Sequence, residues 1–153
     1  MKNIKISKVV IASLLSLSAA SAFADATLDV SATVPAVCYF SSPNYTLDFG
    51  TLDPASSADA QTSVDVSYWC TTGMTATLQA DNGLSESGGV RHLSRGGVDE
   101  IAYSLTLPAG DVATNGPSIP NTATISGTIL NADYKDKHWG AYSDVVALTV
   151  FAE

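Results

Sequence analysis

The chain has 153 residues, of which 46% are hydrophobic and 14% charged, and its formal net charge is −8. This length suits one ordinary domain with a substantial core. Seven basic residues against 15 acidic ones leave no basic stripe to neutralise phosphates, so the composition argues against nucleic-acid binding.

The first 24 residues have the pattern of a secretory signal peptide. Lys2, Lys5 and Lys8 give a positive start, an apolar run follows at 9–20, and AFA at 22–24 offers a small-x-small cleavage site. A membrane helix is the alternative, but the run is shorter than the roughly 20 residues that a span needs. We expect a secreted or periplasmic mature chain, residues 25–153, without a membrane span. Its four basic and 15 acidic residues give it a net charge of −11.

Residues 25–34 alternate between apolar and mostly polar side chains. The apolar positions are Leu28, Val30, Ala32 and Val34. Period two is typical of a strand with one buried face. No tight hairpin follows to supply a partner, and chain ends normally fray. The pattern therefore raises the question of what this apolar face packs against.

Short runs rich in Val, Thr, Ile, Tyr and Leu follow, separated by clusters of Gly, Pro, Asn, Asp and Ser. Together with 27–34, the predicted strands are 36–41, 45–50, 62–71, 74–80, 90–94, 100–107, 122–130 and 143–151. Their number and spacing predict an all-β fold, a β-sandwich. Residues 108–121 are weakly patterned and are predicted to form an exposed loop.

Two cysteines remain in the mature chain, Cys38 and Cys70. In an oxidising compartment a single pair most simply forms one disulfide. A CxxC redox motif is absent, and two isolated thiols without nearby histidines do not make a zinc site. We therefore expect a structural Cys38–Cys70 disulfide.

The sequence contains no recognisable catalytic motif. The two histidines, His92 and His138, lie beside charges and glycines and do not have metal-ligand spacing. The GxSxG, P-loop and GxGxxG patterns are also absent. We expect no enzyme activity, no cofactor and no metal site, and we expect both histidines in solvated loops or at strand ends.

Several acidic residues could in principle hold a cation. Asp81 and Glu86 supply too few oxygens for a calcium loop, and the DNG sequence at 81–83 predicts a turn instead. Asp133, Asp136 and Asp144 lie within or beside residues 135–142 and could bind a cation weakly. A solvated connection is the interpretation that we prefer.

Trp139 and Tyr142 are candidates for contact with a ligand. Exposed aromatic side chains can stack on sugars or anchor a partner. The alternative is that both pack at the mouth of the last strand, and this is what we expect.

The order of motifs resembles the spore coat protein U domain family, which includes the subunits of archaic chaperone–usher pili. An alternating N-terminal segment leads to Cys38, and LDFGTLDP (47–54) and VDVSYWC (64–70) follow. Later come RHLSRGGVDEIAYSLTL (91–107), TISGTI (124–129) and GAYSDVVALTV (140–150). The resemblance covers essentially the whole mature chain.

The resemblance implies an immunoglobulin-like β-sandwich that lacks its final strand and is completed by donor-strand complementation. A periplasmic chaperone fills the groove first, and the N-terminal extension of the next subunit replaces it at an outer-membrane usher. Residues 25–34 then form the donor strand and residues 35–153 the pilin domain. Leu28, Val30, Ala32 and Val34 are the expected groove-filling side chains.

The resemblance also implies the acceptor edge and the partners. Along the terminal strand we expect the groove-side positions Val146, Leu148, Val150 and Phe151, with the register open. The expected partners are neighbouring subunits in a head-to-tail polymer, the chaperone and the usher. The expected location is the periplasm in transit and then the cell-surface fimbrium.

Three functions are compatible with this reading. The first is a structural subunit of a chaperone-assembled fibre that serves adhesion or biofilm formation. The second is a self-contained coat or matrix protein, with residues 27–34 paired inside their own domain. The third is a sugar-binding adhesin that uses Trp139 and Tyr142.

Overall fold

Strands dominate residues 34–153, because β-branched and aromatic residues alternate with polar ones along most of this region. The computed structural model describes residues 24–97 and 99–153. The strands are β1 (Cys38–Phe40), β2 (Ala60–Cys70), β3 (Thr75–Ala80), β4 (Arg91–Ser94), β5 (Glu100–Thr106), β6 (Val112–Ala113), β7 (Asn121–Ile129) and β8 (Leu148–Ala152). One short helix, α1 (Asn131–Tyr134), follows β7.

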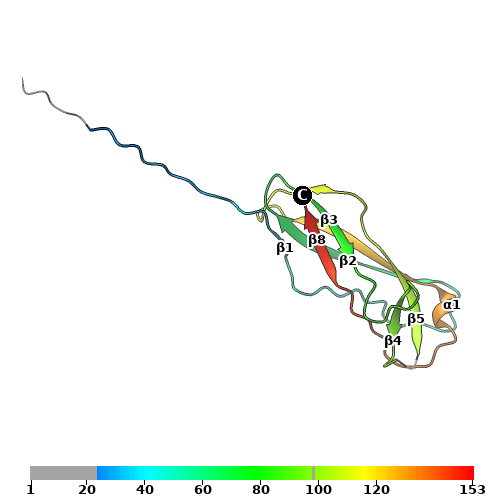
Figure 1. Cartoon of the computed structure of the whole chain (residues 1–153). Coiled ribbons are helices and arrows are strands. Elements are labelled where there is room, and N and C mark those ends of the chain that lie inside the picture. The colour runs from blue at the N-terminus through cyan, green and yellow to red at the C-terminus, as the bar shows by residue number, and fades with distance from the viewer. Residues whose placement is uncertain (1–23, 98) are drawn as a thin grey trace, which may run out of the picture. The chain divides into compact units, whose positions relative to one another are not determined.

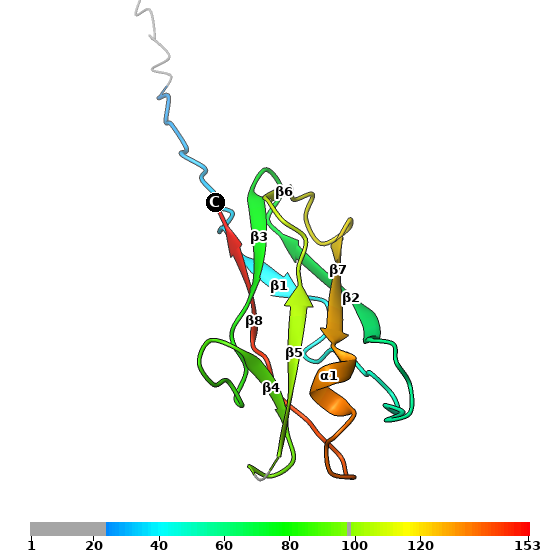
Figure 2. The ribbon, with the colours of Figure 1, turned by 90° about the vertical axis from the view of Figure 1, so that its right-hand side faces the viewer.

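The strands form two antiparallel sheets (Figure 1). One sheet has five strands in the order β1-β2-β7-β5-β4, and the other has three in the order β6-β3-β8. Figure 2 shows β8 beside β3, its strand neighbour in the smaller sheet. Within the described residues, β8 is therefore an edge strand.

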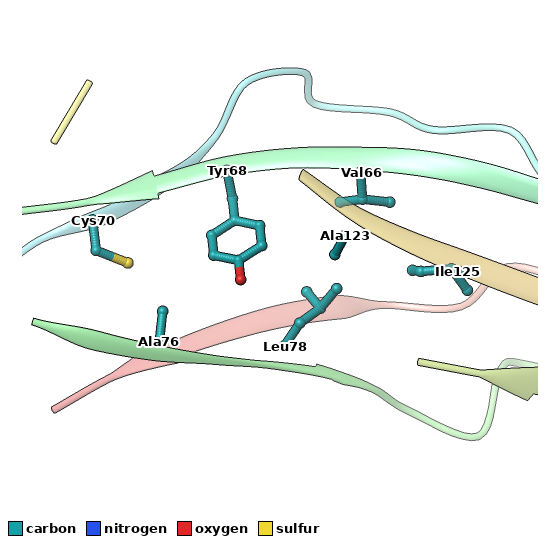
Figure 3. Packing of buried hydrophobic residues seen from close by; sticks show 7 residues of the cluster. All are labelled: Val66, Tyr68, Cys70, Ala76, Leu78, Ala123 and Ile125. Atoms are coloured by element: carbon teal, nitrogen blue, oxygen red, sulfur yellow. The ribbon is translucent and has the colours of Figure 1, made fainter. Parts of the chain in front are cut away.

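The core lies between the two sheets. Inward-facing residues of β2 and β7 meet those of β3, as Figure 3 shows. This cluster consists of Val66, Tyr68, Cys70, Ala76, Leu78, Ala123 and Ile125. A second buried cluster lies towards α1 and consists of Ile101, Tyr103, Ile129 and Tyr134.

The predicted disulfide is confirmed. Cys38 and Cys70 are joined by an S–S bond of 2.05 Å. The two residues lie directly opposite each other in the β1–β2 ladder. The bond therefore fastens the three-residue strand β1 to the longest strand of the fold.

Two predicted strands, 27–34 and 45–50, are wrong as strands in this structure. Neither belongs to a ladder, although residues 45–49 keep the predicted alternation of burial. The predicted strand 143–151 joins its ladder only at Leu148. The short elements β6, inside the predicted loop 108–121, and α1 were missed, because two and four residues carry too little periodicity.

The chain divides after Thr33 into two units, which are described separately. The predicted signal peptide, except Ala24, lies outside the described residues. Residues 24–33 form no strand or helix, and their side chains are exposed. In the described part of the chain, no helix is long and apolar enough to cross a membrane.

Candidate functional site

A groove runs along the domain between two extended segments. One segment is residues 42–49, which follow β1, and the other is residues 142–148, which lead into β8. Its two connected hollows have volumes of about 610 Å³ and 830 Å³. The floor of the smaller hollow is apolar and includes Val64, Val66 and Ile125.

Both walls of the groove alternate in burial. Inward side chains such as Leu47, Phe49, Val146 and Leu148 are only half-buried, and their sequence neighbours are exposed. In a closed sandwich the inward residues of a strand are covered on all sides. The half-burial therefore indicates that the inward side chains of both walls lack the apolar contacts that one further strand would supply.

The first wall is held by Tyr45 and by a glycine of β7. The Tyr45 hydroxyl donates to the Ser67 carbonyl at 2.6 Å and accepts from the Ser67 N–H at 3.2 Å. Further along, Leu47 and Phe49 lie directly on Gly127, where an added Cβ would be 2.5 Å from Leu47 Cδ2 and 2.7 Å from Phe49 Cζ. The wall is thus fixed by side chains rather than by a backbone ladder.

The second wall uses only one of its two backbone edges. Ser143 exchanges both backbone hydrogen bonds with Ser94, and the Val145 carbonyl accepts from the Leu84 N–H. The Ala147 carbonyl accepts from the Asp81 N–H at 3.0 Å. The backbone groups of these odd-numbered residues therefore point away from the groove, and their side chains are exposed.

Backbone groups in an antiparallel strand point alternately to its two sides. The N–H and C=O groups of Asp144, Val146 and Leu148 therefore face the groove. Within the described residues, no strand pairs with this edge. Such an edge is a template for an incoming strand.

One wall position in the groove is charged. Asp144 accepts hydrogen bonds from the Tyr103 hydroxyl at 2.7 Å and from the Ser85 N–H at 3.0 Å, and it lines both hollows. Burial and the hydrogen bond that it donates to Asp144 raise the pKa of the Tyr103 hydroxyl. Tyr103 thus remains a neutral donor that keeps the carboxylate in place.

A second polar cluster lies at the end of the groove. Asp99 accepts hydrogen bonds from the Tyr142 hydroxyl at 2.7 Å and from the His138 N–H at 3.0 Å. Lys137 lies 3.6 Å from the same carboxylate. The hydrogen bonds from Tyr142 and His138, with the charge of Lys137, hold the pKa of Asp99 well below its usual range. The cluster fastens the segment that carries Tyr142.

The expected acceptor positions do not all lie on the groove. Val146 and Leu148 line it. Val150 lines neither hollow and packs against the core cluster that contains the disulfide, as Leu148 also does. Phe151 was placed wrongly, because consecutive residues of a strand face opposite sides; it is 51% exposed on the other face of β8.

The expected donor residues carry exposed apolar side chains. Leu28 and Val30 are each 86% exposed and Val34 is 79% exposed. Ala32 is exposed as well. Contiguous exposed apolar residues are a feature of interaction sites.

Trp139 corrects another expectation. It does not pack at the mouth of the last strand but is 90% exposed at the end of the larger hollow. Tyr142 is half-buried and bound to Asp99. His138 lies in a loop as expected, whereas His92 lies within β4.

The acidic residues considered as cation ligands are not gathered together. Within residues 24–97 and 99–153, no group of three His, Cys, Asp or Glu side chains could hold a metal ion. Asp81 caps its own turn, since it accepts from the Gly83 N–H at 2.9 Å. Asp144 is occupied by Tyr103 and Ser85, as described above.

Sequence reasoning missed Tyr142 and Asp144 as wall residues. The signal was present, because the inward positions of the last strand continue backwards in steps of two from Val146. Asp144 was missed because an acidic residue in such a series is not expected to face inward. Only its hydrogen bonds to Tyr103 and Ser85 make its inward placement understandable.

Comparisons with known proteins agree with this architecture. No curated protein matches the chain. A chain in the crystal structure of the CsuC–CsuE chaperone–tip adhesion subunit pre-assembly complex, from the archaic chaperone–usher Csu pili of Acinetobacter baumannii, is similar in fold. It is 17% identical with a TM-score of 0.50, and the match covers 77% of the present chain and 40% of that chain. The fold is thus an all-β, incomplete immunoglobulin-like sandwich.

The family assignment comes from the sequence itself. The Spore Coat Protein U domain matches residues 24–149, which include both walls of the groove and the alternating N-terminal segment. The chain therefore belongs to the Spore Coat Protein U domain family.

Proposed function

We propose that this chain is a structural subunit of a surface pilus that a periplasmic chaperone and an outer-membrane usher assemble by donor-strand exchange. Residues 25–34 of one copy serve as the donor strand for the groove of the next. The observation that carries the proposal is the groove itself, with its apolar floor and the unpaired edge of Asp144, Val146 and Leu148. The fibre's proposed role is adhesion or biofilm formation.

An added strand would satisfy both deficits of the domain at once. Its backbone would pair with the open edge, and its alternate side chains would fill the gap between the walls. Burying Leu28, Val30 and Val34 contributes about 1.5–3 kcal/mol each, and Ala32 less, so the sum is of order 5–10 kcal/mol before ordering costs. Such an interface forms a stable head-to-tail contact.

The solved complex adds support of a different kind. It joins a chaperone to a pilus tip adhesion subunit, and one of its chains shares the present fold. A chaperone that covers the groove in the periplasm would keep the open edge of β8 from aggregating. The coat-protein alternative requires residues 27–34 as a strand of their own domain, and the structure has no strand there.

The experiment compares inward and outward positions of the donor segment. Val30→Asp places a charge on the apolar face, whereas Thr33→Asp places the same charge on the polar face. Each variant replaces the wild-type chain in cells that display the fibres, and sheared surface material is run in SDS without boiling. We expect ladders from wild type and Thr33→Asp and at least a tenfold loss for Val30→Asp. Undiminished ladders from Val30→Asp would contradict the proposal.

A deletion separates assembly from folding. A chain without residues 25–34, but with its signal peptide, should accumulate in the periplasm bound to a partner and should not polymerise. Size measurement of the purified wild-type chain completes the test. A stable monomer that needs no partner would favour the coat-protein reading.

A further inference from the structure

The groove wall beside β8 offers a limited set of inward positions. Tyr142, Asp144, Val146 and Leu148 line the hollows. The next inward residue, Val150, lines neither hollow. The donor segment also carries four inward side chains at the same two-residue spacing.

The four wall positions are not equivalent. Asp144 is the only charged one of the four, and it is the only one of them that lines both hollows. A large apolar side chain over Asp144 would strip water from the carboxylate, which is costly. A small side chain leaves the carboxylate room for its bonds to Tyr103 and Ser85. The position opposite Asp144 therefore favours the smallest donor residue.

The donor segment has one small inward residue, Ala32, in the third of its four positions. Every strand pair among the described residues of the domain is antiparallel. We infer that residues 25–34 of a second copy enter antiparallel to β8, with the pairs Leu28–Leu148, Val30–Val146, Ala32–Asp144 and Val34–Tyr142. This register rests on the proposed function and names how the same groove is filled.

The neighbouring registers are worse on the same grounds. A shift of two residues towards the C-terminus of β8 puts Val34 against Asp144 and Leu28 against Val150, which lines neither hollow. A shift the other way puts Val30 against Asp144. A parallel donor over the same four positions also places Val30 there. Of these four registers, only the inferred one places Ala32 opposite Asp144; a parallel donor can reach that pairing only by a shift that takes Leu28 beyond Tyr142.

Paired cysteines test the register in assembled fibres. Directly opposite strand residues have Cα atoms about 5.5 Å apart, which a disulfide spans, whereas a two-residue shift adds about 6.6 Å along the strand. The inferred pairs are Leu28→Cys with Leu148→Cys and Val34→Cys with Tyr142→Cys. The matched controls are Leu28→Cys with Val146→Cys, Val34→Cys with Asp144→Cys, Leu28→Cys with Tyr142→Cys, and each single cysteine.

Sheared material is boiled in SDS without reductant, after free thiols have been blocked. We expect covalent ladders from both inferred pairs, their loss on reduction, and no ladders from the controls. Ladders from a control pair, or assembled inferred pairs without a cross-link, would overturn the register but not donor exchange. If unboiled wild-type material gave no ladder at all, the proposed function and the register would both fail.

A test without cysteines covers variants that block assembly. Ala32→Leu enlarges the residue opposite Asp144, whereas Ser31→Leu enlarges its outward neighbour. We expect Ala32→Leu to lower the fibre yield at least tenfold and Ser31→Leu to leave it within twofold. Equal yields from the two variants would overturn the assigned position of Ala32.

Discussion

Gly127 determines how close one groove wall lies to the larger sheet. It is buried in the middle of β7, and Leu47 and Phe49 occupy the space where a side chain would begin. A methyl group there would push both residues outward. The shape of the groove therefore depends on the absence of a single carbon atom.

Gly127→Ala should lower the free energy of unfolding of the mature chain by about 1–3 kcal/mol, because overpacking displaces Leu47 and Phe49. Denaturant unfolding measures the change. Ser126→Ala introduces the same methyl side chain on the exposed face of β7 and should change stability by less than about 0.5 kcal/mol. Equal effects of the two variants would show that the contact with the wall is unimportant.

The Asp99 cluster makes stability depend on pH. The folded-state pKa of Asp99 is depressed, so its contribution is present above the ordinary carboxyl value near 4 and is lost as pH falls further. Asp99→Asn should therefore destabilise the chain at pH 7. The difference in stability between this variant and wild type should become smaller below about pH 4. Thermal unfolding across pH measures both effects.

The control for this prediction is Asp136→Asn, which changes an exposed carboxylate next to Lys137, in the loop after α1. It should follow the wild-type profile. A stability difference between Asp99→Asn and wild type that stays constant from pH 7 to pH 2 would contradict the stabilising role of the ionised Asp99 carboxylate.

At the scale of elements, β1 depends on a covalent bond. It has three residues, and its ladder joins only β2 within the described residues. The disulfide joins Cys38 and Cys70, which are 32 residues apart in the sequence. The loop that it closes contains the whole first groove wall. Constraining that loop in the unfolded chain stabilises a domain that lacks one strand.

Cys38→Ala with Cys70→Ala should lower the free energy of unfolding by about 3–4 kcal/mol, the chain-entropy value for a loop of this length. Reductant should lower the denaturant concentration at the unfolding midpoint of wild type and leave the midpoint of the double variant unchanged. Denaturant unfolding with and without reductant measures this. Equal midpoints for fully reduced and oxidised wild type would refute the stabilising role.

At the scale of the whole molecule, the proposed donor and acceptor are different parts of one chain. A contact between unlike surfaces does not close on itself in pairs and can propagate into a filament. Only Pro35, Ala36 and Val37 separate the last donor residue from Cys38. In the proposed fibre, this three-residue linker would hold consecutive domains close together.

Hydrogen exchange should report the added strand. In fibres, the amides of Val146 and Leu148 should exchange at least tenfold more slowly than in the free Val30→Asp chain, because they gain partners. The Ala147 amide already donates to Asp81 at 2.9 Å and should be protected in both states. Fragmentation mass spectrometry after timed exchange distinguishes these residues. Equal protection of Val146 in both states would count against strand addition at this edge.

Most strands were predictable because their residues alternate locally. Strands β2, β3, β4, β5 and β7 lie within one or two residues of the predicted bounds. The predicted strand 45–50 failed for a tertiary reason, since its alternation is real but its partner is missing. The groove could be inferred only from family resemblance, because a missing strand leaves no local signal in the residues around it.

The sequence by itself determined the all-β class, the cysteine pair and the alternating segment 25–34, since each depends on residue type and spacing along the chain. Only the tertiary structure decided which residues form the groove. It turned Phe151 outward, exposed Trp139 and placed Asp144 in the wall beside Tyr103. The physical reason is that a groove is made by side chains from distant segments, and their common face is fixed by sheet pairing and packing rather than by local pattern.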